Sequence, residues 1–426
     1  MSCHPTVRTG ARTLAASFCG LALLISIAVP AFGQPVLSLN DALSRAIGND
    51  PSAVASRARL EAANASVRQA DVGPRPTLGV DLEDFAGSAP YGAFNSAQTT
   101  AYYERTWERG GKREARVGVA QAEVQVARQR AAVRILDVVA KVQGAWVDAA
   151  AAEAAIAIAD ERVSVAERLD GEVQRRVSRA LDPVFAGERA KAALAQARIA
   201  REQSVETARI ARRSLASWWA GGDDFRVDAG SFLRVEDVAV RPESNPDVAL
   251  LAAEREVASA GIRVAESNGV SDPTFRVGVR HFADGNGVAL MVGGAIPLGV
   301  EGANRANVDR AMAQSRAADA EIAVSRLETR REIERLVADR ARIVTEINRI
   351  ETEVLPTAER AAGLVVQGYS RGGTAFTYLE MADAQRAVID SRTRRVELLR
   401  QFHQDGVRLD RLSGRHVTLI SGQEKK

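Results

Sequence analysis

The sequence contains little cysteine, little lysine and few aromatic residues. Its two cysteines, Cys3 and Cys19, both lie within the first 33 residues, and lysine accounts for five of the 57 basic residues, which we interpret as compositional bias. Aromatic residues make up 5% of the 426-residue chain and hydrophobic residues 46%, so its core must consist mainly of small aliphatic side chains. With 57 basic against 54 acidic residues, the chain lacks the charge excess of a nucleic-acid-binding protein.

Residues 1–33 have the pattern of a secretory signal peptide. Arg8 and Arg12 precede an apolar run over 14–29, and the small residues Ala31 and Gly33 come just before the predicted cleavage point. Cleavage after Gly33 would leave a chain without cysteine, which excludes disulfides, thiolate metal sites and a cysteine nucleophile. The alternative is that the segment remains as a membrane anchor. Beyond it no run reaches the roughly 18 uninterrupted apolar residues of a transmembrane helix, so membrane insertion would have to use strands.

Short motifs recur at a spacing of about 190 to 197 residues. Asn49-Asp50-Pro51 returns as Ser244-Asn245-Pro246, and Ser178-Arg179 returns as Ser370-Arg371. We interpret these echoes as a tandem duplication, the alternative being chance alignment of alanine-rich helices. The predicted organisation is a signal peptide (1–33), a first helix–hairpin–helix repeat (34–217), an inter-repeat equatorial linker (218–244), a second repeat (245–412) and a C-terminal tail (413–426).

Each repeat is expected to contain a helix, a β-hairpin, a very long helix and a return helix. The predicted elements of the first repeat are helix 40–72, strands near 78–82 and 98–107, helix 112–176 and helix 184–217, and those of the second include strands 274–282 and 288–296 and helix 302–368. Small residues seven apart from Val119 to Ala154 indicate a coiled-coil seam. The two shorter helices together match the long one in length, so we expect them to stack end to end beside it.

The predicted strands are amphipathic and of a length that suits a tilted membrane-crossing strand. Four strands cannot close a membrane barrel, because even small barrels need about eight, so a barrel would have to be shared between chains. Its lumen would then be lined by five charged residues: Asp81, Glu83, Glu104, Arg276 and Arg280. The alternative is a pair of ordinary hairpins that face solvent and pack on the helices.

Three motifs resemble the TolC-type outer-membrane efflux proteins, and within them the heavy-metal branch typified by CzcC. They span residues 107–116 (WERGGKREAR), 175–183 (RRVSRALDP) and 368–386, which ends in YLEMADAQR. The resemblance implies a mainly α fold with a small β part, in which duplicated helical hairpins form a periplasmic tunnel and a homotrimer forms a 12-stranded barrel in outer-membrane lipid of a Gram-negative bacterium. It also implies a periplasmic adaptor, an inner-membrane RND pump and heavy-metal cargo such as cobalt, zinc, cadmium or copper. Such a protein is a conduit without cofactor, not an enzyme.

The resemblance further suggests where partners and cargo would meet the chain. The expected adaptor-docking residues at the two helical turns are Ser178, Arg179, Asp182, Ser370, Arg371, Gly372 and Gly373. Ala180 stands where the family usually has glycine, and the second turn has an extra residue. Glu380 and Asp383 match acidic positions at the tunnel entrance, and because they are three residues apart they share a helix face. The alternative for this pair is an ordinary solvated face.

Two other functions have weaker support in the sequence. His281, His403 and His416 are the histidines beyond the predicted signal peptide, and no two of them have metal-ligand spacing, so we expect no selective metal site and assign metal choice to the pump. A periplasmic coiled-coil scaffold or adaptor that is not a channel remains the alternative from another class, although an adaptor normally has one hairpin and this chain has two.

Overall fold

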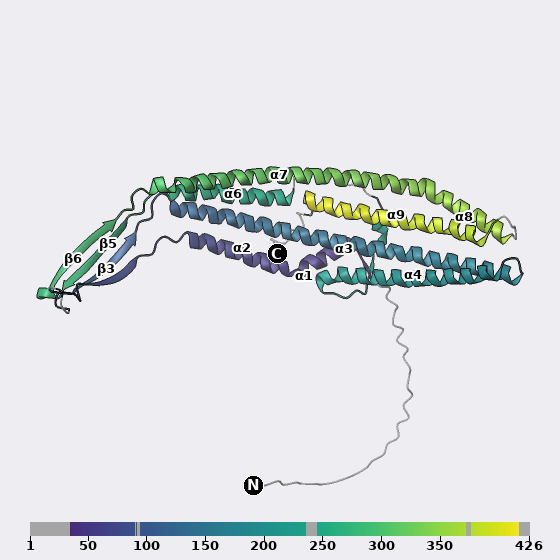
Figure 1. The fold of residues 1–426 in the computed structure, drawn as a ribbon, viewed down its shortest axis with the longest axis horizontal. Coiled ribbons are helices and arrows are strands. Elements are labelled where there is room, and N and C mark those ends of the chain that lie inside the picture. Colours follow the sequence, from purple (N-terminus) through teal and green to yellow (C-terminus); the bar gives the residue numbers. More distant parts are fainter. Residues whose placement is uncertain (1–34, 90, 92–93, 236–244, 372–375, 417–426) are drawn as a thin grey trace, which may run out of the picture.

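The computed structural model describes residues 35–89, 91, 94–235, 245–371 and 376–416. The chain forms an elongated rod with a β-sheet at one end and the turns between long helices at the other (Figure 1). The predicted signal peptide, Gly372, Gly373 and residues 417–426 of the predicted tail lie outside the described residues.

The first repeat is organised around one very long helix. It contains α1 (Leu39–Asn49), α2 (Pro51–Ala70), α3 (Lys112–Ser178) and α4 (Val184–Ala216). The 67 residues of α3 include no proline, and its end lies two residues beyond the predicted one. Helices α2 and α4 both pack on α3 and follow one another along it (Figure 1). The predicted end-to-end stacking of two shorter helices beside a long one is confirmed.

The first predicted helix is not continuous, which corrects the prediction of one helix over 40–72. It breaks at Asp50, whose backbone is extended because the following Pro51 disfavours helical geometry in the residue before it. The Asp50 carboxylate accepts a hydrogen bond from Ser52 N at 2.9 Å and so caps α2.

The second repeat has the same plan with one irregularity. It contains α6 (Pro246–Ser267), α7 (Val300–Arg349), a π-helical turn η4 (Ile350–Val354), α8 (Leu355–Ser370) and α9 (Tyr378–Ser413). The sequence predicted one helix over 302–368, whereas the structure has the π-helical turn within it. Pro356 explains the irregularity, since proline lacks an N–H and its ring crowds the carbonyl four residues earlier.

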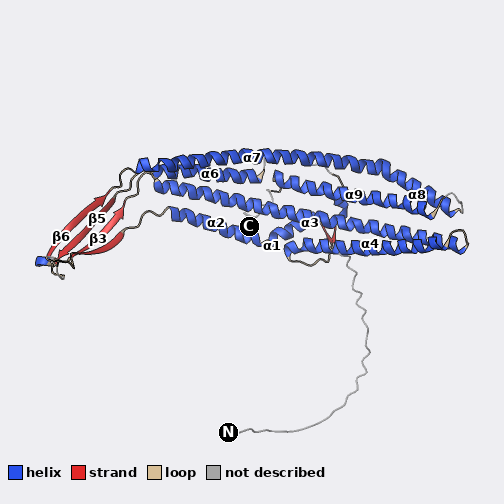
Figure 2. Ribbon diagram, in the orientation of Figure 1, coloured by secondary structure: helices blue, strands red, loops and turns tan. Residues whose placement is uncertain are grey.

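The two hairpins form one antiparallel sheet at the end of the rod (Figure 2). Its strands are β2 (Thr77–Glu83), β3 (Gln98–Thr106), β5 (Thr274–Phe282) and β6 (Gly287–Ala295), in the order β2-β3-β5-β6. The pairing of β3 with β5 joins the repeats and places Glu104 opposite Arg276. A short turn η3 (Asp284–Asn286), in which Gly285 has φ 72°, connects β5 to β6.

The described part of the inter-repeat segment packs around the middle of the rod. It forms η1 (Ser217–Trp219), β4 (Arg226–Val227) and α5 (Ala229–Phe232), and β4 pairs in parallel with the N-terminal β1 (Val36–Leu37). The sequence did not predict these short elements. They cover the largest apolar core, in which Trp146 of α3, Phe232 of α5 and Phe402 of α9 are buried together.

Among the described residues, one helix is long and apolar enough to resemble a membrane span. It is α3, and half of the qualifying 18-residue window is buried inside the chain itself. The contacts of α3 with α2, α4, α6 and α9 account for its apolar composition.

Candidate functional site

The charged residues predicted to line a lumen lie on one face of the sheet. Arg276 Nη2 donates to Glu104 Oε2 at 2.8 Å, and its Nη1 lies 3.5 Å from Asp81 Oδ2 on the next strand but one. Its guanidinium also stacks 4.0 Å from the ring centroid of Tyr102. The register makes these contacts possible, because alternate residues of antiparallel strands point to the same side.

A second arginine extends the same polar ladder toward the end of the rod. Arg280 donates to Glu83 at 2.7 Å, and also to the side-chain oxygens of Thr100 and Gln98, each at 2.8 Å. Together with the first ladder, these contacts join β2, β3 and β5. The polar face therefore consists of paired charges of both signs.

The opposite face of the sheet is apolar and exposed. Leu78 is 83% exposed, Leu290 82% and Val292 86%, values that a water-soluble sheet packed on helices would not show. Further exposed residues on this face are Val80, Leu82, Tyr103, Phe275, Val277, Val279 and Val288. Within the described residues, β2 and β6 each pair with a single neighbour, so both edges of the sheet are open.

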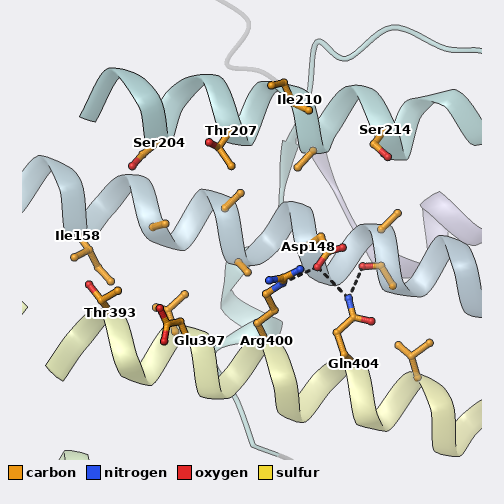
Figure 3. A pocket seen from close by; sticks show the side chains of 18 of the residues that line it. Asp148, Ile158, Ser204, Thr207, Ile210, Ser214, Thr393, Glu397, Arg400 and Gln404 are labelled. Atoms are coloured by element: carbon orange, nitrogen blue, oxygen red, sulfur yellow. Dashed lines mark hydrogen bonds and ion pairs between the residues drawn. The ribbon is translucent and has the colours of Figure 1, made fainter. Parts of the chain in front are cut away.

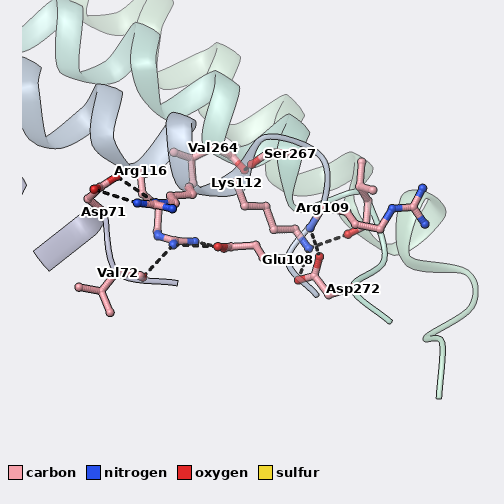
Figure 4. Close-up of polar contacts among 11 residues, drawn as sticks. Asp71, Val72, Glu108, Arg109, Lys112, Arg116, Val264, Ser267 and Asp272 are labelled. Carbon is pink, nitrogen blue, oxygen red and sulfur yellow. Dashed lines mark hydrogen bonds and ion pairs between the residues drawn. The ribbon is translucent and has the colours of Figure 1, made fainter. Parts of the chain in front are cut away.

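The sheet meets the helices through a compact set of ion pairs (Figure 4). Lys112 Nζ, at the start of α3, lies 2.6 Å from both Asp272 Oδ2 and the carbonyl oxygen of Val270. Asp272 also accepts from Arg109 N at 2.9 Å. Arg116 pairs with Glu108 in the same region. These contacts fix the strand ends of both repeats to the first turns of α3.

Two glycines allow the chain to turn from β3 into α3. Gly110 and Gly111 have φ of 72° and 71°, a left-handed conformation that favours glycine. A Cβ at Gly110 would lie 2.6 Å from Val270 Cβ, so this position also needs the missing side chain for space. Gly299, just before α7, has φ 73°, so a left-handed glycine also precedes the long helix of the second repeat.

At the far end of the rod, a buried ion pair joins the two helical turns. Arg176 of α3 donates from Nε and Nη2 to the Asp182 carboxylate at 3.1 and 3.2 Å, and from Nη1 to the carbonyl oxygen of Tyr369 at 2.7 Å. The Tyr369 hydroxyl donates to the same carboxylate, and the Arg176 guanidinium lies 4.3 Å from the Tyr369 ring centroid. We call these three residues the tip clasp. Sequence reasoning missed Arg176 and Tyr369, since no local pattern marks contacts 193 residues apart.

The electrostatics of the tip clasp keep it charged at neutral pH. Burial would raise the pKa of Asp182, but hydrogen bonds from Arg176 and Tyr369 outweigh burial and hold that pKa below its ordinary value. Burial and the adjacent carboxylate raise the pKa of Tyr369, which keeps its hydroxyl protonated as a donor.

The other predicted docking residues lie at the same end. Ser178, Arg179, Ser370 and Arg371 are exposed there, whereas the Asp182 side chain is largely buried in the tip clasp. Ala180 has φ 55°, the left-handed conformation for which the family's glycine would be suited. The structure adds an exposed apolar patch beside them that the sequence analysis did not single out, made of Leu181, Val184 and Phe185.

The predicted acidic pair lies in the first turns of α9. Glu380 forms a capping box with Thr377, whose backbone N donates to Glu380 Oε2 at 2.7 Å. Hydrogen bonds from the Thr377 backbone and hydroxyl lower the pKa of Glu380, so it is ionised at neutral pH. Asp383 is exposed and lies 3.7 Å from Arg386. Both carboxylates are thus near one end of the rod, each with a local partner.

A long groove of about 1020 Å³ runs along α3 between α4 and α9 (Figure 3). One polar cluster crosses it, in which Asp148 accepts from Arg400 at 2.7 Å and from Gln404 at 3.0 Å. Ile158, Ile210 and several alanines make the rest of the wall largely apolar. Among the described residues, no group of three or more His, Cys, Asp or Glu side chains is arranged to hold a metal ion.

A helical rod that carries a sheet with one charged and one exposed apolar face defines the subunit of a membrane export channel. The chain belongs to the outer membrane efflux protein family, whose model matches residues 42–221 and 242–415. It is accordingly an outer-membrane channel protein that extends into the periplasm.

Comparison with individual proteins agrees with this assignment. The chain is 28% identical over 404 residues to the cobalt-zinc-cadmium resistance protein CzcC of Cupriavidus metallidurans, covering 91% of this chain and 93% of that protein. It is 26% identical over 298 residues to the nickel-cobalt-cadmium resistance protein NccC of Alcaligenes xylosoxydans xylosoxydans, covering 67% and 66%. Its fold resembles the outer membrane protein VceC of Vibrio cholerae, with TM-score 0.69, 20% identity and coverage of 88% and 96%. It also resembles CusC, with TM-score 0.73, 16% identity and coverage of 88% and 91%.

Proposed function

We propose that three copies of this chain join their sheets into one 12-stranded barrel, with the helices forming a tunnel across the periplasm. The observation that carries this proposal is the sheet with its paired charges on one face and exposed apolar side chains on the other. Four strands are too few to close alone, and open edges are unstable in hydrocarbon. In the barrel, Asp81, Glu83, Glu104, Arg276 and Arg280 would face water. The apolar groove along α3 would face a neighbouring copy.

Disulfide cross-linking tests the shared barrel directly. The predicted mature chain has no cysteine, so one cysteine placed within 78–82 of β2 and one within 288–292 of β6 would be its only thiols. These edge strands are three strand spacings apart in one sheet, roughly 14 Å, too far for an intrachain disulfide. At least one register should therefore give covalent dimers and trimers, whereas the single-cysteine controls should give no trimer. A water-soluble monomer without cross-links in any register would instead support a scaffold.

The proposed channel is passive and works with two partners, a periplasmic adaptor and an inner-membrane RND pump. The exposed residues of the tip support docking there, with Ser178, Arg179, Asp182, Ser370, Arg371, Gly372 and Gly373 as the proposed contacts. Replacing Leu181 and Phe185 by serine should abolish export while cross-linked trimers still form. The matched control is Ile199→Ser, which changes an exposed apolar residue of α4. Equal export by both variants would contradict docking at this patch.

We propose heavy-metal cations as cargo, because the relatives CzcC and NccC are both named for resistance to cobalt and cadmium. In a trimer, Glu380 and Asp383 would place six carboxylates around the tunnel entrance, which would favour cations. The variant Glu380→Gln with Asp383→Asn should reduce cation preference in planar-bilayer conductance. Glu321→Gln with Glu328→Gln, two exposed acids of α7, should leave cation preference unchanged.

A deletion strain tests the cargo. Relative to its parent, it should gain more sensitivity to cobalt and cadmium than to organic drugs.

A further inference from the structure

A second groove lies at the end of the sheet that adjoins the helices. Its volume is about 1080 Å³, and its lining includes Tyr103, Val277 and Val292 on the exposed apolar face. These three are direct neighbours across β3, β5 and β6. Arg105 and Arg109 line the same groove nearer to the helices. The groove is therefore apolar toward the middle of the sheet and cationic toward the helical rod.

Among the described residues, the guanidinium groups of Arg105 and Arg109 form no hydrogen bond and no ion pair within 4 Å. The nearby carboxylates are already engaged: Asp272 pairs with Lys112, and Glu108 pairs with Arg116. Glu104 pairs with Arg276 on the other face of the sheet. Both Arg105 and Arg109 are exposed. Glu114 also lines the groove, and Asp272 lies near enough to Arg109 for the two charges to attract. This end of the groove consequently carries an excess of positive charge, with two exposed guanidinium groups that form no ion pair among the described residues.

An aromatic residue separates the two charges. Trp107 is 66% exposed, and its ring lies 6.4 Å from the ring of Phe275. Trp, Tyr and Arg at the border between apolar and charged surface match the boundary of a bilayer, where indole rings lie at headgroup level. Tyr103 and Arg105 lie on the apolar face of β3, and Trp107 and Arg109 follow beyond its end. In the proposed barrel, this order would run from hydrocarbon to headgroup depth.

We propose that this groove binds one anionic phospholipid of the inner leaflet, with its phosphate between Arg105 and Arg109 and an acyl chain along Tyr103, Val277 and Val292. The inference rests on the proposed function, in which the apolar face of the sheet meets lipid. Charge complementarity selects the occupant: the excess of positive charge at this end favours phosphatidylglycerol over a zwitterionic lipid of the same chain length. The apolar wall adds contacts that a free phosphate ion would lack.

Tryptophan quenching measures this binding in the full-length trimer reconstituted in phosphatidylcholine vesicles. A minor fraction of phosphatidylglycerol with brominated acyl chains should quench Trp107 more than brominated phosphatidylcholine does, and Trp107→Phe should remove that difference. Arg105→Gln with Arg109→Gln should weaken the preference about 30-fold, roughly fivefold for each arginine. The matched control, Arg57→Gln with Arg59→Gln, removes two exposed arginines of α2 and should keep the preference.

Three outcomes would overturn the inference. Equal quenching by the two brominated lipids in the wild type would show no selective site. An unchanged preference in the Arg105 and Arg109 variant would show that other residues cause it. Loss of the preference in millimolar inorganic phosphate would indicate an ion site instead of a lipid site. Flotation of the vesicles shows whether the chain inserts into the bilayer at all. A chain that does not insert would contradict the proposed channel, whereas a chain that inserts without preferring the anionic lipid would contradict only this inference.

Discussion

The tip clasp should control how easily the two helical turns at the end of the rod separate. The side chains of Arg176 and Asp182 are 9% and 14% exposed, so Asp182→Asn removes a negative charge beside a nearly buried guanidinium. Breaking a buried pair in this way costs about 3 kcal/mol, which corresponds to about a 100-fold rise in the open fraction. Tyr369→Phe removes one hydrogen bond to the carboxylate and keeps the ring under Arg176. Its cost should be about 1.5 kcal/mol, or about tenfold.

Amide hydrogen exchange of the purified protein measures this opening. Protection of residues 173–182 and 365–371 should fall by the factors given for each variant, while protection in the middle of α3 should not change. The control Glu188→Gln breaks an exposed pair with Lys191 on α4 and should alter protection by less than about threefold. Equal protection in Asp182→Asn and Glu188→Gln would refute the reasoning that the clasp joins the turns.

The tip clasp should also make the stability of this end of the rod depend on pH. Because the pKa of Asp182 is lowered in the folded protein, its contribution to stability is present at neutral pH and is lost as the pH falls through that lowered value. Protection at the tip should therefore be constant between about pH 6 and 8 and should fall below about pH 4, where unfolded aspartate begins to protonate. Asp182→Asn should remove this dependence from the tip.

Two further predictions test the sheet and its junction with the helices. Gly110→Ala should destabilise the protein by at least about 1 kcal/mol in thermal unfolding, since it combines a left-handed backbone with a clash at Val270; Gly302→Ala, in open space within α7, should be neutral or stabilising. Leu290→Arg should reduce insertion into vesicles by about 2 to 4 kcal/mol, whereas Ala289→Arg on the polar face of the same strand should insert normally. Equal effects at these two neighbours would contradict the assignment of the Leu290 face to lipid and the Ala289 face to water.

The elements with a strong periodic pattern could be predicted from the sequence. A proline-free stretch with small residues seven apart predicted α3 to within two residues at its end, and alternation predicted β5 over the observed range. The interruptions were missed for an identifiable reason. Asn49-Asp50-Pro51 was interpreted as a repeat marker, although aspartate before proline also signals a helix break. Pro356 carried the corresponding signal in the second long helix, where the structure has a π-helical turn.

A candidate site could be predicted from the sequence where its residues alternate along a single strand. Charges alternating with apolar residues identified the polar face of the sheet, but their pairing depends on register between strands from different repeats, as for Glu104 and Arg276. The tip clasp had no such signal, because its residues come from turns that meet only after both long hairpins have packed. The exposed patch around Phe185 could have been suspected from apolar residues flanking the proline of a turn.

Arginine at the helix contacts has a structural role that composition alone did not suggest. The seams consist of small residues, which permit close approach but do little to fix the helices against sliding. Arg411 of α9 donates to Asp137 of α3 at 2.7 Å and to Asp247 of α6 at 2.9 Å. A guanidinium that bonds two helices at once, as the mostly buried Arg411 does, is satisfied in one register only. Lysine could not reproduce this forked geometry, so the preference for arginine at such positions follows from alignment of the rods as well as from compositional bias.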